Sequence, residues 1–166
     1  MSNAVSIVLL DALDSKILNQ AMLQVTRAGI SADYEGEVSC KKGFDARRTQ
    51  WRADILLSAC LNEVVQKGQL SLIITERDLY AASLNFVFGL ARRDLQAAIV
   101  SWHRLRDDNV SIFADRLAKE IVHEVGHLQG LGHCPDPSCV MWFSNTLGET
   151  DTKGINFCHI CRRKVL

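Results

Sequence analysis

The run HEVGHLQGLGHC, which begins at His123, carries the residue types and the spacing of a metal site. On a helix, positions i and i+4 share one face, so His123 and His127 would offer both imidazoles to one ion. Glu124 is rotated by about 100° from His123, which places it beside the ion, where a general base would meet a water molecule. Gly130 predicts a left-handed helix end, after which the chain would return His133 as a third ligand. Three imidazoles that leave one coordination position open form the ligand set of a catalytic zinc. The alternative is an ordinary solvent-exposed helical face, which would not require Gly130 and His133 at these offsets.

The cysteines predict a second metal site. Four of the six form two pairs near the end of the printed chain: Cys134, Cys139, Cys158 and Cys161. Their spacing is that of a zinc ribbon, so we expect a closed structural zinc held by four thiolates, with free thiols as the alternative. Cys60 is expected in the core. Cys40, in a polar stretch, is a minor candidate for an inhibitory thiolate on the catalytic zinc.

The motif HEVGHLQGLGH resembles the signature of the metzincin zinc proteases, and Met141 in the segment CVM looks like the methionine of their Met-turn. The two cysteine pairs narrow the resemblance to the archaemetzincins, a branch with a second, four-cysteine zinc. The stretches TERDLY, NFVFGLAR and VSWHRL are similar to this family as well. The resemblance implies two zinc ions per chain and a zinc metallopeptidase that acts on peptides or proteins, with aminopeptidase action as one form. It also implies that Met141 is an apolar floor beneath the imidazoles, and that residues 86–91 form an antiparallel edge strand along which a substrate would lie.

Strands and helices alternate upstream of the motif. The patterns predict strands over residues 5–10, 30–38, 70–75, 85–91 and 97–102, and helices over 14–29, 46–66 and 111–129. That alternation indicates an α/β fold, a metzincin-like and mostly parallel sheet packed on helices, including the helix of the motif. We expect a single protease domain over 1–166. Residues 1–129 would supply the sheet and helices, and residues 130–166 the Met-turn and a small zinc-stabilised subdomain.

Three further expectations concern the motif helix. Ser111 is expected to cap it. Glu120 is interpreted as an exposed carboxylate, with a hydrogen-bond acceptor for a ligand imidazole as the alternative. Gly126 costs up to about 1 kcal/mol relative to alanine inside a helix, which predicts a close approach by a neighbouring segment.

Composition narrows the class of protein. The 166 residues are 48% apolar, and 19 basic side chains balance 19 acidic ones. Zero net charge gives no electrostatic reason to expect a nucleic acid or an anionic membrane as partner. Since no apolar run reaches the ~20 residues of a membrane span and no signal peptide is recognisable, we expect a cytoplasmic protein, for which a monomer is plausible.

Two alternatives to a peptidase stay open. One is a zinc-stabilised peptide-binding protein whose peptidase activity is weak or lost. The other, a nucleic-acid module built on the cysteine site, is disfavoured by the missing basic excess. By analogy alone, Trp142, Phe143 and Asn145 are candidates for a specificity pocket, and His159 is a minor candidate zinc ligand.

Overall fold

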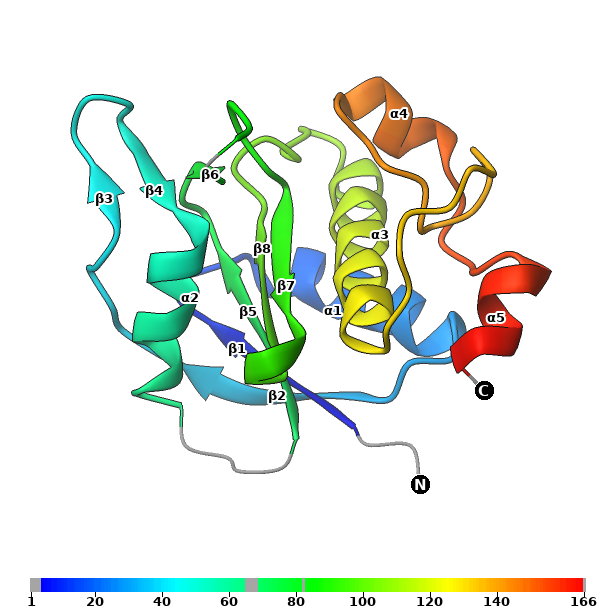
Figure 1. Ribbon diagram of the computed structural model, residues 1–166, viewed down its shortest axis with the longest axis horizontal. Coiled ribbons are helices and arrows are strands. Elements are labelled where there is room, and N and C mark those ends of the chain that lie inside the picture. The colour runs from blue at the N-terminus through cyan, green and yellow to red at the C-terminus, as the bar shows by residue number, and fades with distance from the viewer. Residues whose placement is uncertain (1–3, 65–68, 82, 166) are drawn as a thin grey trace.

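The computed structural model describes residues 4–64, 69–81 and 83–165, and its main feature is a five-stranded sheet (Figure 1). The strands follow the order β2-β1-β5-β8-β7, with the bounds Ala32–Glu37, Val5–Leu9, Leu70–Thr75, Ala97–Ser101 and Gly89–Arg92. β2, β1, β5 and β8 are parallel, whereas β7 pairs with β8 in the antiparallel sense and forms one edge. The sheet is therefore mostly parallel with one antiparallel edge strand, as the sequence predicts.

Helices connect and cover these strands. Their bounds are α1 Ser15–Arg27, α2 Ala53–Leu61, the 3-10 helix η1 Arg93–Leu95, α3 Val110–Leu128, α4 Leu147–Thr152 and α5 His159–Val165. A second, smaller sheet has the order β3-β4-β6, with the bounds Phe44–Asp45, Gln50–Arg52 and Leu79–Tyr80. Asp14 caps α1 as predicted, since its side chain accepts a hydrogen bond from the backbone N–H of Lys16. No helix in the described part of the chain is both long enough and apolar enough to cross a membrane.

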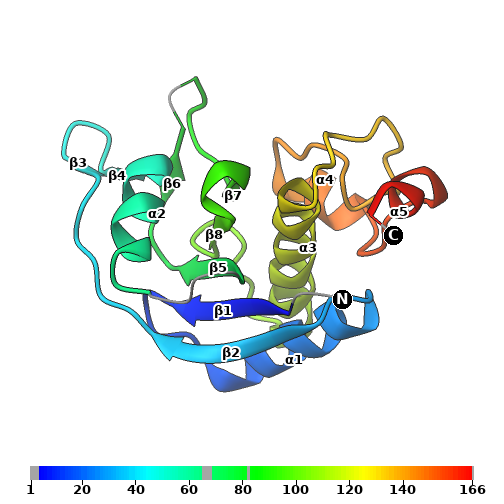
Figure 2. The same ribbon diagram turned by 60° about the horizontal axis from the view of Figure 1, so that its bottom comes forward.

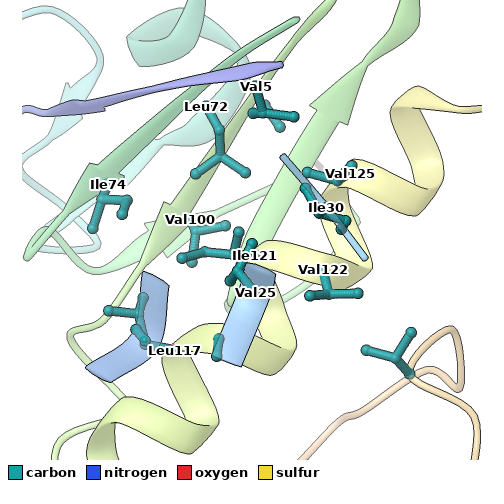
Figure 3. Close-up of a cluster of buried hydrophobic side chains, with 14 of the residues drawn as sticks. Val5, Val25, Ile30, Leu72, Ile74, Val100, Leu117, Ile121, Val122 and Val125 are labelled. Carbon is teal, nitrogen blue, oxygen red and sulfur yellow. The ribbon is translucent and has the colours of Figure 1, made fainter. Parts of the chain in front are cut away.

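Helices cover both faces of the main sheet, which explains why its central strands are buried along almost their whole length and mostly apolar. Neighbouring residues of β5 point to opposite faces: Leu72 and Ile74 join the core beneath α1 and α3, and Ile73 joins the core beneath α2. Figure 2 shows α1 and α2 on opposite sides of the sheet. Figure 3 shows side chains of the strands, α1 and α3 meeting in the first core, with Val25, Val100 and Ile121 among them.

α3 is the element on which the site is built, and it lies between β7 and the C-terminal segment in both views (Figures 1 and 2). Residues after 130 pack against it: Leu131, Val140, Met141 and Phe157 belong to the same buried core as α1 and α3. This shared core supports our proposal of one domain over 1–166, in which the last part holds α3 from the side opposite the sheet edge.

The helix expected over residues 46–66 is wrong at its start. β4 lies there instead, because Trp51 pairs with β3 on one side and with β6 on the other, and α2 begins only at Ala53. Pairing with distant segments overrides the local helical periodicity. The predicted end is wrong as well, because α2 ends at Leu61 with Asn62 as its C-cap, five residues before the expected end. The Lys67-Gly68 pair expected to close the helix lies outside the described residues.

The strand expected over 85–91 also begins later, at Gly89. Val87 forms only an isolated bridge with Leu79, and the chain reaches regular pairing with β8 two residues further on. The predicted edge position is confirmed, and its start is corrected.

Candidate metal centre and cleft

A side-chain cap determines where α3 begins. Its cap is Asn109, whose side-chain oxygen accepts hydrogen bonds from the backbone N–H groups of Ser111 and Ile112. Ser111 is therefore the second residue of the helix, and the expectation that it caps the helix is wrong. Asn is as good a capping residue as Ser, so residue type alone could not place the boundary.

Three histidines converge at the other end of α3. One ligand atom from each of His123, His127 and His133 can be chosen so that all lie within 4.8 Å of one another. Gly130 ends the helix with φ +97°, and the backbone N–H of Leu131 donates to the carbonyl of Gly126, so the chain turns back as predicted. The turn brings the third imidazole to the first two.

Backbone carbonyls orient two of these rings. Nδ1 of His123 lies 2.8 Å from the carbonyl oxygen of Val140, and Nδ1 of His127 lies 2.8 Å from that of Leu131. Because a carbonyl only accepts, each Nδ1 carries the proton and each Nε2 is left with a lone pair. The two Nε2 atoms are 3.0 Å apart, so both lone pairs are placed where a single metal ion could accept them. Sequence analysis could not find these carbonyls, since every residue carries one.

The electrostatics of the imidazoles also suit a metal. Burial lowers the pKa of His123 well below its ordinary value, and the positive charge of Lys153 lowers it further. Burial likewise lowers the pKa values of His127 and His133. Neutral imidazole is the form that binds a metal ion, so the three side chains are ready as ligands at neutral pH.

Glu124 lies on α3 beside the histidines and lines the same cleft. Only 4% of this residue is exposed. Burial raises the pKa of its carboxyl well above the ordinary value, and the neighbouring charge of Glu120 raises it further, against the opposing effect of Lys153. A carboxyl group with a raised pKa can both accept and return a proton near neutral pH.

Gly89 of the edge strand makes room for that carboxyl group. A Cβ atom on Gly89 would lie 2.6 Å from Oε1 of Glu124 and 2.8 Å from its Cγ, closer than real Cβ contacts. The glycine therefore lets β7 approach the side chain directly. The sequence indicates close contact at Gly89 but does not identify Glu124 as the neighbour.

A cleft of about 670 Å³ opens over these groups. Its walls are β7, α3, the turn that carries His133, and the segment before α4. Phe143 and Asn145 line it, whereas Trp142 is not among its lining residues. The ring of Phe143 lies 4.7 Å from that of His133, between centroids, so one pocket candidate directly flanks the third imidazole.

Met141 is fully buried and packs against α3 at Gly126. A Cβ atom on Gly126 would overlap Sδ of Met141 and would lie 3.0 Å from Cε1 of Phe157. Met141 and Phe157 are thus the close neighbours that a glycine inside the helix predicts. The carbonyl of Met141 also accepts a hydrogen bond of 2.9 Å from the backbone N–H of Cys134, which ties this turn to the residue after the third histidine.

The four C-terminal cysteines form a second cluster, and their four Sγ atoms all lie within 4.8 Å of one another. The Sγ atoms of Cys134 and Cys158 are 3.8 Å apart, and Sγ of Cys139 accepts a hydrogen bond from the backbone N–H of Cys158. Zn–S bonds of about 2.3 Å in a tetrahedron place sulfurs about 3.8 Å apart, so the donor set fits zinc. Hydrogen bonds, led by the backbone N–H of Cys161, lower the pKa of Cys158 to about 7. His159 is not part of this cluster.

The structure contradicts the interpretation of Glu120 as an exposed carboxylate. Its side chain is 4% exposed, and Oε1 lies 3.0 Å from Nζ of Lys153, whose side chain is fully buried. The hydroxyl of Thr150 donates to the same oxygen. Because Lys153 follows α4 directly, this buried ion pair fastens α4 to α3. Arg116, one turn earlier, adds a two-pronged contact to Asp151 at 2.7 and 2.8 Å.

The two remaining cysteines lie away from the histidines. Cys60 is fully buried in the core beneath α2, as predicted. Cys40 packs against that same core and does not line the cleft. This placement removes the basis for an inhibitory thiolate on the catalytic zinc.

Three comparisons relate the chain to known proteins. The sequence pattern of peptidase family M54 matches residues 54–166. The archaemetzincin of Methanopyrus kandleri is 42% identical over 140 residues, which cover 78% of each chain. Its crystal structure superposes with a TM-score of 0.88 at 34% identity, over 99% of this chain and 96% of that one. A zinc-dependent peptidase from Methanocorpusculum labreanum superposes with a TM-score of 0.89 at 28% identity, over 98% of this chain and all of that one.

Proposed function

Because the chain belongs to the archaemetzincins, peptidase family M54, and is a zinc metallopeptidase, we propose that Glu124 is the general base of its reaction. We also propose that the catalytic zinc is held by the three histidines of the motif: His123, His127 and His133. One observation carries both proposals: the three imidazoles and the Glu124 carboxyl group face a single cleft. The substrate is a peptide or protein.

The residues divide the work of peptide hydrolysis among them. When bound, the zinc ion supplies Lewis-acid chemistry, which lowers the pKa of water and polarises a carbonyl group. The carbonyls of Val140 and Leu131 hold two imidazoles in the tautomer that leaves Nε2 free for the ion. Glu124 accepts a proton from the water that attacks the scissile carbonyl and then passes it to the leaving amine. Its burial in the cleft keeps bulk water from competing for that proton.

The edge strand is the proposed binding site for the substrate backbone. β7 pairs with β8 on one side only, and its other edge borders the cleft. An extended peptide can add to such an edge through backbone hydrogen bonds and lie across the histidines. Gly89 brings this strand close to Glu124, so a peptide on the strand would pass beside the general base.

The cysteine cluster is proposed to hold a second, structural zinc, which makes two zinc ions per chain. Four thiolates close the coordination shell and leave no position for substrate. Cys134 directly follows His133, so the structural zinc would fix the turn that delivers the third catalytic ligand. Met141, packed at Gly126 beneath the same turn, would act as the apolar floor.

Digestion of a mixed peptide library tests the proposal. The wild type should cleave internal or terminal peptide bonds, and His127→Ala should lose both activity and one zinc ion per chain while the cysteine site stays filled. Parallel peptides with free and acetylated amino termini distinguish aminopeptidase action, which acetylation would block, from endopeptidase action. Zinc binding without cleavage of any peptide would favour the alternative, a zinc-stabilised peptide-binding protein.

A further inference from the structure

Arg93 marks one end of the cleft. Gly89, Ala91 and Arg93 occupy alternate positions at and just beyond β7, and alternate residues of a strand share one face. Gly89 faces Glu124, and all three residues line the cleft. The guanidinium carbon of Arg93 lies 3.4 Å from the point where a Cβ of Gly130 would sit, an ordinary contact distance, so this cation lies directly against the histidine turn.

The charge of Arg93 is not neutralised by any described residue. Its exposed side chain makes no ion pair or hydrogen bond within 4–64, 69–81 and 83–165. Asp94, the nearest acidic residue in the sequence, is bound by Arg92 at 2.6 Å. Arg92 lies beside α2, where it lines a separate depression together with Asp54.

The acidic groups of the cleft are already engaged. Glu120 and Glu124 are the carboxylates among its described lining residues. Glu120 is paired with Lys153, and Glu124 is the proposed base. Apart from the proposed zinc ion, the cleft thus offers one side-chain cation without a described partner and no free carboxylate. This charge pattern attracts a negative group on the substrate and leaves no carboxylate to pair with a substrate ammonium group.

We propose that Arg93 is a specificity-determining residue that binds a substrate carboxylate and gives this peptidase a preference for acidic peptides. The proposal rests on the proposed function, because it takes the cleft as the substrate site. Arg93 is four residues along the chain from Gly89, or roughly 14 Å at about 3.4 Å per residue. A peptide extended along β7 would therefore place the bound carboxylate about two to four residues from the scissile bond, on the Gly130 side. The planar guanidinium can bind both carboxylate oxygens together.

Peptide pairs test this assignment. Each pair places Glu or Gln at one position, scanned over four residues on both sides of a bond that the wild type cleaves. A second set carries a free or an amidated carboxyl terminus, which distinguishes an acidic side chain from a terminal carboxylate as the bound group. At one position the wild type should prefer the acid about threefold to fivefold in kcat/KM, as expected for a partly exposed ion pair. The preference should shrink between about 0.02 and 0.5 M salt because of screening.

Variants then assign the preference to the residue. Arg93→Gln should bring the ratio of acidic to neutral substrate to about one, and Arg93→Glu should reverse it in favour of Lys at the same position. Arg92→Gln/Asp94→Asn is the matched control: it removes the neighbouring ion pair without freeing Asp94 to pair with Arg93, and it should keep the wild-type ratio. Binding of the acidic peptide to Glu124→Gln, measured by calorimetry with and without Arg93→Gln, gives a readout that does not depend on turnover.

Equal rates for every acidic and neutral pair, or an unchanged ratio in Arg93→Glu, would overturn the proposal while leaving the peptidase function intact. A loss of the ratio in Arg92→Gln/Asp94→Asn equal to that in Arg93→Gln would overturn it as well. Absence of any cleavage by the zinc-loaded wild type would instead contradict the proposed function. Circular dichroism and zinc content of each variant exclude unfolding as the cause.

Discussion

Lys153→Met should destabilise the protein strongly, because it leaves the carboxylate of Glu120 buried without its cation. The two charged atoms are 3.0 Å apart, and the side chains are 0% and 4% exposed. At an effective dielectric constant of about 20, two unit charges at that distance attract by about 5 kcal/mol. Loss of one partner from a buried pair costs about 3–5 kcal/mol. We expect a loss within this range in the free energy of unfolding.

The double variant Glu120→Gln/Lys153→Met removes both charges and replaces them with side chains of similar size. Since a buried pair replaced by neutral groups costs little, we expect a loss below about 2 kcal/mol, smaller than that of Lys153→Met alone. Arg52→Met is the matched control: its ion pair with Asp54 has a similar distance, 2.9 Å, but side chains that are 42% and 36% exposed. That variant should lose less than about 1 kcal/mol.

The assay is urea unfolding at saturating zinc, followed by circular dichroism and tryptophan fluorescence, whose coincidence tests for a two-state transition. Additive effects of Glu120→Gln and Lys153→Met would refute the reasoning, because they would show that the two groups do not interact. A cost for Lys153→Met no greater than that for Arg52→Met would refute it too.

Three further predictions concern the two metal sites. Gly89→Ala should push Glu124 away and lower kcat about ten- to a hundredfold with little change in stability. Gly148→Ala should leave kcat unchanged, because its added Cβ would meet only Oγ1 of Thr146, at 3.8 Å, an ordinary contact distance. Steady-state kinetics and urea unfolding of both variants decide this. Cys158→Ala should weaken zinc binding at the three-histidine site as well, by misplacing the third histidine; chelator competition measures this, and full catalytic zinc in the variant would contradict it. Burial lowers the pKa of His123 in the folded, metal-free protein, so below pH 6.5 the unfolded state binds more protons than the folded state. The free energy of unfolding should therefore fall by up to about 1.4 kcal/mol per pH unit below that value. Urea unfolding at several pH values should show a weaker dependence of this free energy on pH for His123→Gln, and an identical dependence would contradict the assignment.

The sequence predicts which histidines and cysteines cluster, because their spacing is local. The spacing of His123 and His127 on one helix, with Gly130 to end it, determines their meeting before any tertiary contact is known. The groups that orient the histidines are not part of this spacing pattern. The orienting acceptors are backbone carbonyls, and their identity depends on where the chain after residue 130 returns.

Glu120 illustrates the same limit for charged groups. Its position on α3 predicts solvent exposure only if no other segment covers that face of the helix. Lys153 lies more than thirty residues later and reaches Glu120 because α4 folds back on α3. No helical pattern contains that information. The predicted bounds of the central strands β1, β5 and β8 agree with the structure to within one residue, because short, mostly apolar runs indicate strands buried on both faces. The short strand β4 depends instead on distant partners.

We propose above all that the cleft holds a catalytic zinc site with Glu124 as its base. The most direct test is zinc content per chain together with peptidase activity, for the wild type and for Glu124→Ala. We expect two zinc ions in both proteins and a loss of activity of at least about a hundredfold in the variant. Wild-type activity in Glu124→Ala would contradict the assignment of the base, and two zinc ions without activity in either protein would contradict the catalytic role of the site.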